Sequence, residues 1–474
     1  MKKMDKMHEE CGIVGIYGHP DASNLTYLGL YALQHRGQEA SGIVTYDGKQ
    51  FRQRKAQGLV ADVFNPKNIA LLTGSAAIGH NRYSTAGDSV LDNVQPLMGN
   101  SPRGRVAMVH NGNLVNATVL IKDLEAAGAV FQSTVDSEVI LHLLARSSAK
   151  YLKDRIIDSL FQVRGAYSLL FLTEEGLIAV RDPYGVRPLL LGQLENGYVL
   201  ASESCVFDLV GAKLIRDIKQ GELLIINEKG LESFYPFPKV QAAQCVFEFV
   251  YFARPDSTIF SQSVYGIRKR LGQELAKESP VSADIIIPVP DSGVTAALGY
   301  AETAMIPFEM GLTRNHYVGR TFIEPKAAIR HFGVKVKLNA VREVLDGKRV
   351  VVVDDSLVRG TTSRKIVTMI RDAGAKEIHV RISSPPILSP CFYGIDTPTR
   401  KELIASSHTV DEICKHLTAD SLKYLSEEGM FRAIYHNESA KDSHFCKACF
   451  TGQYPIALEE KESRQLSLFD KINR

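Results

Sequence analysis

The sequence predicts two domains, an α+β sandwich of sheets followed by an open, parallel α/β sheet. Up to about residue 240, short apolar runs alternate with Gly-rich turns, and helical periodicity is limited to Leu25–Gln34 and Ser137–Leu144. Many strands with few helices favour stacked sheets with helices outside. From about residue 283 the apolar runs lose their alternation, which is typical of strands buried on both faces of a parallel sheet. Ser233–Lys239, with its two prolines, is expected to link the two domains.

The individual strands follow from these patterns. In the first domain they are expected at Val106–Asn111, Ala166–Thr173, Leu177–Arg181 and Tyr198–Ser202. In the second domain Ala283–Val289 and Arg349–Val353 are each followed by a polar loop and a helix pattern. Ser363–Asp372 is the second of these helices, and Glu377–Ile382 is the next strand. The repeated βαβ order predicts a parallel sheet, and the tail from about Pro398 is expected to be mostly helical and charged.

Composition narrows the function class. The chain has 474 residues, 45% of them hydrophobic and 23% charged, as in an ordinary globular protein. A net charge of +3 is too small to indicate nucleic acid or a membrane surface as the main partner. Seven cysteines, an odd number in a chain this long, do not indicate a secreted disulfide framework. We therefore expect a cytoplasmic protein.

The string Arg349–Thr362 carries the most specific chemistry of the second domain. A buried strand ends in Asp354 and Asp355, and a short loop then runs into a helix. The N–H groups at a helix N-terminus bind phosphate, Gly360 permits close backbone approach, and two threonine hydroxyls follow. Adjacent carboxylates suit the vicinal hydroxyls of a ribose, directly or through a divalent cation. Considered alone, a pair of aspartates here is also compatible with an acidic turn and ordinary N-capping.

As a whole, this string resembles the phosphoribosylpyrophosphate (PRPP) signature of type I phosphoribosyltransferases. In that resemblance Ile287–Gly293 forms the pyrophosphate loop, with Ser292 close to a magnesium ion. Tyr317–Lys326 would then be a lid in which Arg320 and Lys326 supply positive charge, although its pattern also suits a solvated loop. No Gly-x-x-x-x-Gly-Lys-Ser/Thr occurs, which disfavours a nucleotide-hydrolysing P-loop.

Cys11 stands between a ten-residue segment rich in charged side chains and an abrupt apolar strand pattern. Residues 1–10 contain no apolar stretch of the kind a signal peptide needs. Removal of this segment as a leader would give Cys11 both a nucleophilic thiol and a free α-amine that can act as its base. The alternative is a frayed tail before a buried cysteine, and this segment alone favours it.

Further strings of the first domain are suited to amide hydrolysis. They are Gln34–Glu39, Arg82–Gly87, His110–Leu114 and Val135–Glu138. Asn111 and the backbone N–H of Gly112 could form an oxyanion hole, Arg82 could pair with a substrate carboxylate, and Asp136 with its ammonium group. Each residue alone also fits a structural role. Together, in this order after Cys11, the strings resemble the glutaminase domain of N-terminal-nucleophile (Ntn) amidotransferases, and this resemblance favours leader removal.

Four of the cysteines could form a metal site. Cys446 and Cys449 form a Cys-x-x-Cys pair, which Cys245 and Cys391 could complete to four thiolates. Zinc and an iron–sulfur cluster both accept four Cys ligands, so ligand chemistry leaves the choice open.

All these features together resemble the glutamine phosphoribosylpyrophosphate amidotransferase family, in the branch with a leader peptide and an iron–sulfur cluster. The resemblance implies an α+β Ntn hydrolase sandwich followed by an α/β type I phosphoribosyltransferase domain. It implies a leader at 1–10, a glutaminase domain at 11–240 and a phosphoribosyltransferase domain at 241–474. The implied reaction converts glutamine, PRPP and water to 5-phosphoribosylamine, pyrophosphate and glutamate, which begins purine synthesis.

The resemblance also implies site residues, cofactors and partners. The cofactors are Mg²⁺ and one [4Fe–4S] cluster per subunit, the inhibitors are purine nucleotides, and the assembly is a homo-oligomer, a tetramer or a dimer. The roles are as follows: catalysis by Cys11, Asn111 and Gly112; glutamine binding by Arg36, Arg82, Thr85 and Asp136; an ammonia channel at Tyr83; PRPP binding by Asp291, Ser292, Gly293, Arg320, Lys326, Asp354, Asp355, Ser356, Arg359, Gly360, Thr361 and Thr362; magnesium at Ser292, Asp354 and Asp355; and the cluster at Cys245, Cys391, Cys446 and Cys449.

Two other classes remain open. A different amidotransferase could share the glutaminase domain, although the PRPP string argues against it. A non-catalytic PRPP-binding regulator could share the second domain, but it would have no use for Cys11 and the residues that hold glutamine.

Overall fold

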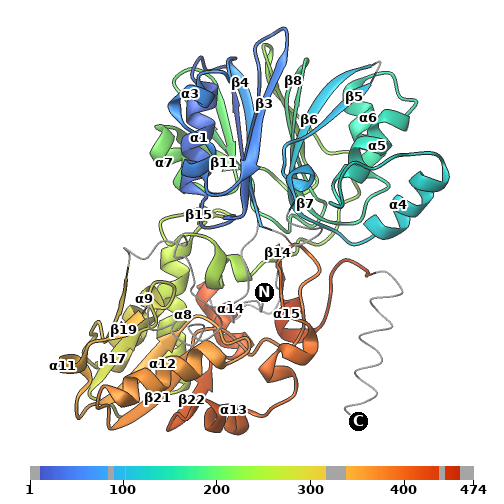
Figure 1. The fold of residues 1–474 in the computed structure, drawn as a ribbon. Coiled ribbons are helices and arrows are strands. Elements are labelled where there is room, and N and C mark those ends of the chain that lie inside the picture. The colour runs from blue at the N-terminus through green and yellow to red at the C-terminus, as the bar shows by residue number, and fades with distance from the viewer. Residues whose placement is uncertain (1–10, 84–89, 102, 316–337, 437–443, 459–474) are drawn as a thin grey trace.

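The computed structural model describes residues 11–83, 90–101, 103–315, 338–436 and 444–458. Two sheets that face each other form the upper part of the molecule in Figure 1, and a smaller sheet with its helices forms the lower part. The strands of the upper part come from residues 12–234 and those of the parallel sheet below from residues 285–424.

The upper part is a sandwich of two antiparallel sheets. Within the described residues, one sheet has seven strands in the order β11-β9-β10-β1-β4-β2-β3, and the other has six in the order β13-β12-β8-β7-β6-β5. The first contains β1 (Gly12–Tyr17), β2 (Ala40–Tyr46), β3 (Phe51–Gln57), β4 (Ala76–Arg82), β9 (Leu190–Gln193), β10 (Tyr198–Ala201) and β11 (Lys213–Asp217). The second contains β5 (Leu97–Ser101), β6 (Gly104–Leu114), β7 (Gly165–Thr173), β8 (Gly176–Arg181), β12 (Leu223–Asn227) and β13 (Gly230–Phe234).

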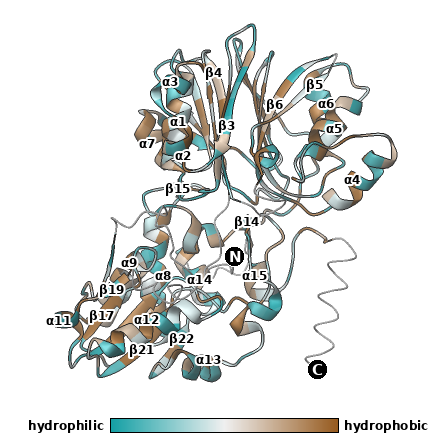
Figure 2. Cartoon of the chain, in the orientation of Figure 1, coloured by the Kyte–Doolittle hydropathy of each residue, from teal (hydrophilic) through white to brown (hydrophobic). Residues whose placement is uncertain are grey.

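Strand alternation explains why helices cover the outer faces. In β1, Ile13 points into the core between the sheets, whereas Val14 packs outward with Leu30 of α1. Each sheet is therefore apolar on both faces and needs a second layer. Figure 2 shows β4 and β6 as hydrophobic and the edge strand β3 as hydrophilic. The helices of this part are α1 (Ala22–Ala32), α2 (Val60–Val63), α3 (Pro66–Ile69), η1 (Leu91–Asn93), α4 (Ala117–Ala126), α5 (Glu138–Arg146), α6 (Leu152–Leu160) and α7 (Cys205–Val210).

The lower part is built on four parallel strands in the order β17-β20-β21-β22. They are β17 (Ile285–Pro288), β20 (Arg349–Asp354), β21 (Glu377–Ile382) and β22 (Ser421–Tyr424). In β20, Val351 packs in the core that contains Leu271 of α8, while Val350 packs in the core that contains Ile366 of α12. Its helices are η2 (Glu248–Phe252), α8 (Val264–Glu278), α9 (Val294–Ala304), α11 (Arg342–Leu345), α12 (Thr361–Asp372), η4 (Arg400–Glu402), η5 (Ile404–Ser406), α13 (Val410–Leu417), α14 (Glu427–Tyr435) and α15 (Ala448–Thr451).

Three small two-stranded sheets complete the described part of the chain. They are β14 (Gln244–Cys245) with β23 (Phe445–Cys446), β15 (Thr258–Ile259) with β16 (Gln262–Ser263), and β18 (Leu312–Arg314) with β19 (Leu338–Ala340). The β14–β23 pair brings the end of the chain back to the start of the lower part.

The fold class predicted from the sequence is confirmed, with differences in detail. The first domain has more helices than the two expected, since α2, α3, η1, α4, α6 and α7 were not predicted. The expected linker Ser233–Lys239 begins inside β13. The tail, which was expected to be mostly helical, also contributes β22 to the parallel sheet. A strand of four residues between helix patterns is too short for the alternation of apolar and polar side chains to be recognised in the sequence.

Candidate active sites

Cys11 lies beside the end of β4. It directly precedes β1, whose Gly12 pairs with Asn81 of β4. The Cys11 thiol is half-buried, and its Sγ donates a hydrogen bond to the backbone oxygen of Tyr83 at 3.6 Å. Arg82 precedes Tyr83 and is only 2% exposed. The sequence-predicted nucleophile, carboxylate clamp and channel residue are thus adjacent in space.

The end of β6 faces this point. The His80 ring in β4 hydrogen-bonds to the backbone oxygen of His110 in β6, with Nε2 and O 3.2 Å apart. Asn111 follows, and its side chain is fully buried with neither its nitrogen nor its oxygen hydrogen-bonded to another described residue. A buried amide without hydrogen bonds destabilises the folded protein. The presence of Asn111 at this position therefore points to a ligand that forms those hydrogen bonds.

Gly112 has a backbone conformation that requires glycine. Its φ is +149°, and a Cβ here would lie 2.0 Å from the backbone oxygen of Ala166 on β7. Any side chain would therefore push β6 away from β7. The backbone of Gly112 therefore lies directly against β7 on the side that a side chain would otherwise occupy.

Asp136 is bonded to the same end of β6. One carboxylate oxygen accepts a hydrogen bond from the Leu114 backbone N–H at 2.7 Å, and the other accepts one from Ser137 Oγ at 3.0 Å. It also lies 3.9 Å from Nδ1 of His110. Burial lowers the pKa of His110, so the imidazole is neutral near pH 7 and is not itself a cation beside Asp136.

Arg36, which is predicted to bind glutamine, lies in a buried ion-pair network. It is 1% exposed, and its guanidinium pairs with the carboxylates of Glu203 and Glu248. Burial alone would raise the pKa of Glu203, but His35 and Arg36 outweigh burial and hold that pKa well below its usual range. Arg36 is therefore part of a buried ion-pair network next to the strand that begins after Cys11. Thr85, the other predicted glutamine-binding residue, lies outside the described residues.

The two PRPP loops meet at the carboxyl ends of neighbouring parallel strands. Asp354 ends β20, and the side chains of Asp354 and Asp355 are 4% and 1% exposed. The loop after β17 packs against them, since a Cβ on Gly293 would lie 2.6 Å from the backbone oxygen of Val353. This edge is where open α/β sheets bind ligands.

The phosphate loop has the predicted helix N-terminus. Gly360 has φ +78° and precedes α12, which begins at Thr361. Arg359 forms an ion pair with Glu402 at 2.8 Å, and Asp291 pairs with Arg314. Ser356 donates a hydrogen bond to Asp355. The predicted lid residues Arg320 and Lys326 lie outside the described residues.

The four predicted cluster cysteines come together. Cys245 lies opposite Cys446 in the parallel pair β14–β23. The backbone oxygen of Cys449 accepts hydrogen bonds from Leu388 and Ser389, at 2.9 and 3.0 Å, close to Cys391 in the chain. Burial, with Cys245, Cys446 and Cys391 nearby, raises the pKa of Cys449.

The four cysteines form one all-thiol donor set. Among the described residues, no three His, Cys, Asp or Glu side chains lie close enough together to hold a single metal ion. Four Cys side chains are the ligand set that a [4Fe–4S] cluster takes.

Comparison with known proteins identifies the family of the chain. Residues 80–208 match the model of the family described as glutamine amidotransferase domain. The chain is 52% identical to the amidophosphoribosyltransferase of Bacillus subtilis (strain 168), over 95% of each chain. It is also 52% identical to amidophosphoribosyltransferase 1, chloroplastic, of Arabidopsis thaliana, over 95% of this chain and 80% of that one. The chain belongs to the amidophosphoribosyltransferase family.

Solved structures of the family have the same fold. The structure of an allosteric regulatory enzyme of purine biosynthesis matches with a TM-score of 0.91 at 52% identity, over 95% of this chain and 97% of the other. The B. subtilis glutamine PRPP amidotransferase complexed with ADP and GMP matches with a TM-score of 0.91 at 51% identity, over 95% and 98%. The protein is thus a glutamine-dependent amidophosphoribosyltransferase that catalyses the first step of de novo purine biosynthesis, with an Ntn glutaminase domain and a phosphoribosyltransferase domain.

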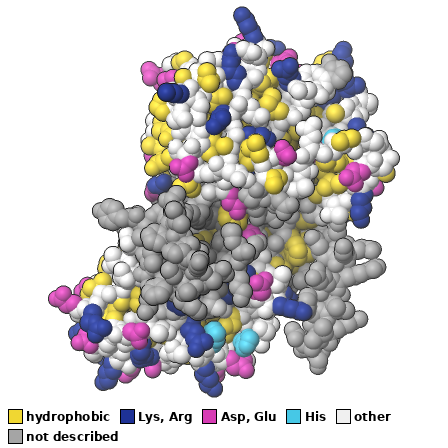
Figure 3. Space-filling view, viewed as in Figure 1, with side chains coloured by type: hydrophobic (Ala, Val, Ile, Leu, Met, Phe, Trp, Pro, Cys, Tyr) yellow, Lys and Arg dark blue, Asp and Glu magenta, His cyan; other side chains and the backbone are white. Residues whose placement is uncertain are grey.

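Other observations describe the surface of this amidophosphoribosyltransferase. On the face shown in Figure 3, Lys and Arg side chains are interspersed with Asp and Glu. None of the helices in the described ranges has the length and apolar character to cross a membrane.

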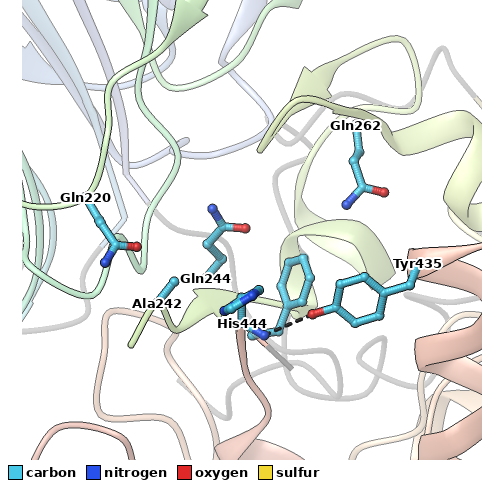
Figure 4. A pocket seen from close by; sticks show the side chains of 7 residues that line it. Gln220, Ala242, Gln244, Gln262, Tyr435 and His444 are labelled. Atoms are coloured by element: carbon cyan, nitrogen blue, oxygen red, sulfur yellow. Dashed lines mark hydrogen bonds between the residues drawn. The ribbon is translucent and has the colours of Figure 1, made fainter. Parts of the chain in front are cut away.

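A pocket of about 360 Å³ opens between the two parts, and its lining includes Gln220, Gln244, Gln262, Tyr435 and His444 (Figure 4). None of the predicted site residues lines it.

Sequence reasoning missed several residues at the glutaminase site. Glu203, Glu248 and Arg187 form the buried network around Arg36, and Asn113 binds the second domain through Phe392. Asn113 stands inside the predicted His110–Leu114 string, which could have drawn attention to it. The other three stand outside all motifs.

Proposed function

We propose that amidophosphoribosyltransferase activity in this protein arises from two sites, with Cys11 as the glutaminase nucleophile after removal of residues 1–10. The glutaminase domain then covers residues 11–240 and the phosphoribosyltransferase domain residues 241–474. The observation that carries this proposal is the buried Asn111 amide, whose polar atoms have no hydrogen-bond partner among the described residues, at the strand end facing Cys11.

In the first half-reaction the α-amine of Cys11 accepts the thiol proton, and Sγ forms a bond to the amide carbon of glutamine. The oxyanion accepts hydrogen bonds from Asn111 Nδ2 and the Gly112 N–H, while Arg82 pairs with the substrate carboxylate and Asp136 with its ammonium group. Collapse breaks the C–N bond, and the α-ammonium returns the proton to the departing ammonia. Water then cleaves the thioester to glutamate and restores the thiol.

In the second half-reaction ammonia attacks C1 of PRPP as the bond from C1 to pyrophosphate breaks, and one proton is released. Asp354 and Asp355 hold the ribose, residues from Arg359 to Thr362 bind the 5′-phosphate, and Ser292 and Gly293 lie at the pyrophosphate. Arg320 and Lys326 are proposed for the lid and Thr85 for glutamine. Magnesium bound through Ser292, Asp354 and Asp355 would neutralise charge on the leaving group. Tyr83, which follows Arg82 and accepts the Cys11 hydrogen bond, is proposed to line the ammonia path.

Replacing Asn111 with alanine is expected to lower the glutamine-dependent kcat by about 10²–10³-fold, because one oxyanion donor is lost. Synthesis from added ammonia should stay within about twofold of wild type, since the second site is untouched. Steady-state assays with each nitrogen source measure both. Asn196→Ala, at an exposed position, is the control. Equal losses with both nitrogen sources would contradict the oxyanion role.

We also propose one [4Fe–4S] cluster bound by Cys245, Cys391, Cys446 and Cys449, with a structural role. Purified protein should contain about four irons and four acid-labile sulfides per chain, and Cys391→Ser should lower both while Cys414→Ser leaves them unchanged. Iron and sulfide analysis provides the measurement. Zinc at one equivalent without sulfide would overturn the assignment.

For regulation and assembly we propose purine nucleotide inhibition, a homo-oligomer (tetramer or dimer), and a cytoplasmic location. Support for nucleotide binding comes from the B. subtilis relative, which was solved as a complex with ADP and GMP.

A further inference from the structure

The segment Cys391–Gly394 lies against the end of β6. The Asn113 side chain donates from Nδ2 to the backbone oxygen of Phe392 at 2.9 Å. The Arg187 guanidinium donates to the next backbone oxygen, that of Tyr393, from two nitrogens at 3.0 and 2.7 Å. Two successive carbonyls of the lower part are therefore held by side chains of the glutaminase part.

Gly394, the next residue of this segment, packs against the backbone of Gly112, which is proposed to donate to the oxyanion. Its φ is +110°, and a Cβ placed on it would lie 3.0 Å from the carbonyl carbon of Gly112 and 3.1 Å from its oxygen. Gly112 is confined on its other side by Ala166. The Gly112 peptide is thus packed between β7 and the backbone of Gly394, and a shift of either moves it.

Arg187 extends the contact to the Cys11 side of the site. It is fully buried, and its guanidinium lies 3.6 Å from the carboxylate of Glu248, which also binds Arg36. A Cβ on Gly12 would lie 3.5 Å from the Cβ of Arg36. One buried network therefore reaches from Tyr393 to the strand that begins after Cys11.

The other side of the segment is anchored among the cysteines. The Tyr393 backbone N–H donates to Sγ of Cys391 at 3.3 Å, and the Tyr393 hydroxyl donates to the backbone oxygen of Ile456 at 2.7 Å. The segment therefore cannot move independently of the chain around Cys391.

We propose that Asn113, Arg187 and Gly394 are positioning residues that hold the Asn111–Gly112 end of β6 against the segment Cys391–Gly394. The second domain thereby sets the geometry of the glutaminase oxyanion hole. The proposal rests on the proposed function in one respect, the assignment of Asn111 and Gly112 as oxyanion donors. None of the three contacts glutamine in this scheme, so each acts through the position of β6.

Gly394→Ala gives the sharpest test because the chain offers a matched control. Gly230 has φ +108° and open space where a Cβ would stand, so Gly230→Ala carries the same backbone strain without the contact. Gly394→Ala is expected to lower kcat/KM for glutamine by about 100-fold, the usual consequence of a displacement near 1 Å. Synthesis from ammonia should stay within about twofold, and Gly230→Ala should match wild type in both assays.

Asn113→Ala provides a second variant without added strain. The rate at which the glutamine analogue 6-diazo-5-oxo-norleucine alkylates Cys11 is measured beside steady-state activity, since alkylation depends on the oxyanion hole and not on PRPP. It should fall about tenfold or more, the equivalent of one buried hydrogen bond. The iron content of each variant is measured and should equal that of wild type.

The outcomes separate this inference from the proposed function. If Cys11→Ala keeps glutamine-dependent synthesis, the proposed function fails. If Cys11→Ala is inactive with glutamine but Gly394→Ala equals Gly230→Ala, only the positioning proposal is overturned. It is also overturned if Gly394→Ala loses ammonia-dependent and glutamine-dependent synthesis equally, because the contact would then serve general folding.

Discussion

Cys11→Ala is expected to lower glutamine-dependent synthesis of 5-phosphoribosylamine by about 10⁴-fold or more, because no covalent thioester can form. Synthesis from added ammonia should continue near the wild-type rate, because the PRPP loops follow β17 and β20 in the other domain. The measurement compares steady-state rates with glutamine and with ammonia at saturating PRPP. The substitution removes one sulfur from a half-buried position, so its effect on stability should be small.

Cys414→Ala is the control for this experiment. Cys414 is half-buried in α13, and its thiol donates to the backbone oxygen of Ala419 at 3.3 Å. It belongs to the lower part of the molecule and is far in sequence from β4 and β6, which carry the glutaminase residues. It should change neither rate. Retention of glutamine-dependent activity by Cys11→Ala would remove Cys11 from the mechanism. N-terminal sequencing of active protein tests the leader separately: the chain should begin at Cys11, and active protein that began at Met1 would contradict the role of the α-amine.

Two strands of the parallel sheet, β20 and β21, were the most predictable elements. Glu377–Ile382 is observed with its predicted bounds, and Arg349–Val353 is extended only by Asp354. Continuous β-branched runs between polar loops leave little choice of structure, because both faces must be buried. The first domain was less predictable, because helices such as α4 and α6 contribute one apolar stripe to a surface that only the folded sheet defines.

Site residues could be predicted from the sequence when their role depends on the local backbone, but not when it depends on contacts between distant parts of the chain. Residues whose role depends on local backbone were identified from motifs, for example Gly112, Gly360 and the aspartates that end β20. Arg36 shows the limit of this approach. Its partners Glu203 and Glu248 are more than 160 residues away in sequence, and no local pattern shows that a buried guanidinium will meet two carboxylates. For the same reason Arg187 could not be connected to Tyr393 before the fold was known.

The double variant Asp354→Asn/Asp355→Asn is expected to lower synthesis from both glutamine and ammonia by about 100-fold or more. Each amide keeps the shape of the carboxylate but loses the negative charge that binds ribose hydroxyls and magnesium, a charge-assisted interaction worth about 1.5–3 kcal/mol per site. The KM for PRPP should rise, whereas alkylation of Cys11 by 6-diazo-5-oxo-norleucine in the absence of PRPP should be unchanged. This pattern is the reverse of that expected for Cys11→Ala.

Stability provides the decisive control for this variant. Asp354 and Asp355 are adjacent and almost fully buried, so their like charges repel each other at low local dielectric. The Asp355 backbone N–H donates to Oδ1 of Asp354 at 3.0 Å, and asparagine can preserve that bond. The variant should therefore unfold at a temperature no lower than wild type, and Asp411→Asn, at an exposed position, should change neither stability nor activity. A loss of activity without a loss of stability assigns the two carboxylates to substrate binding, whereas wild-type KM for PRPP with full ammonia-dependent synthesis would leave them a purely structural role at the end of β20.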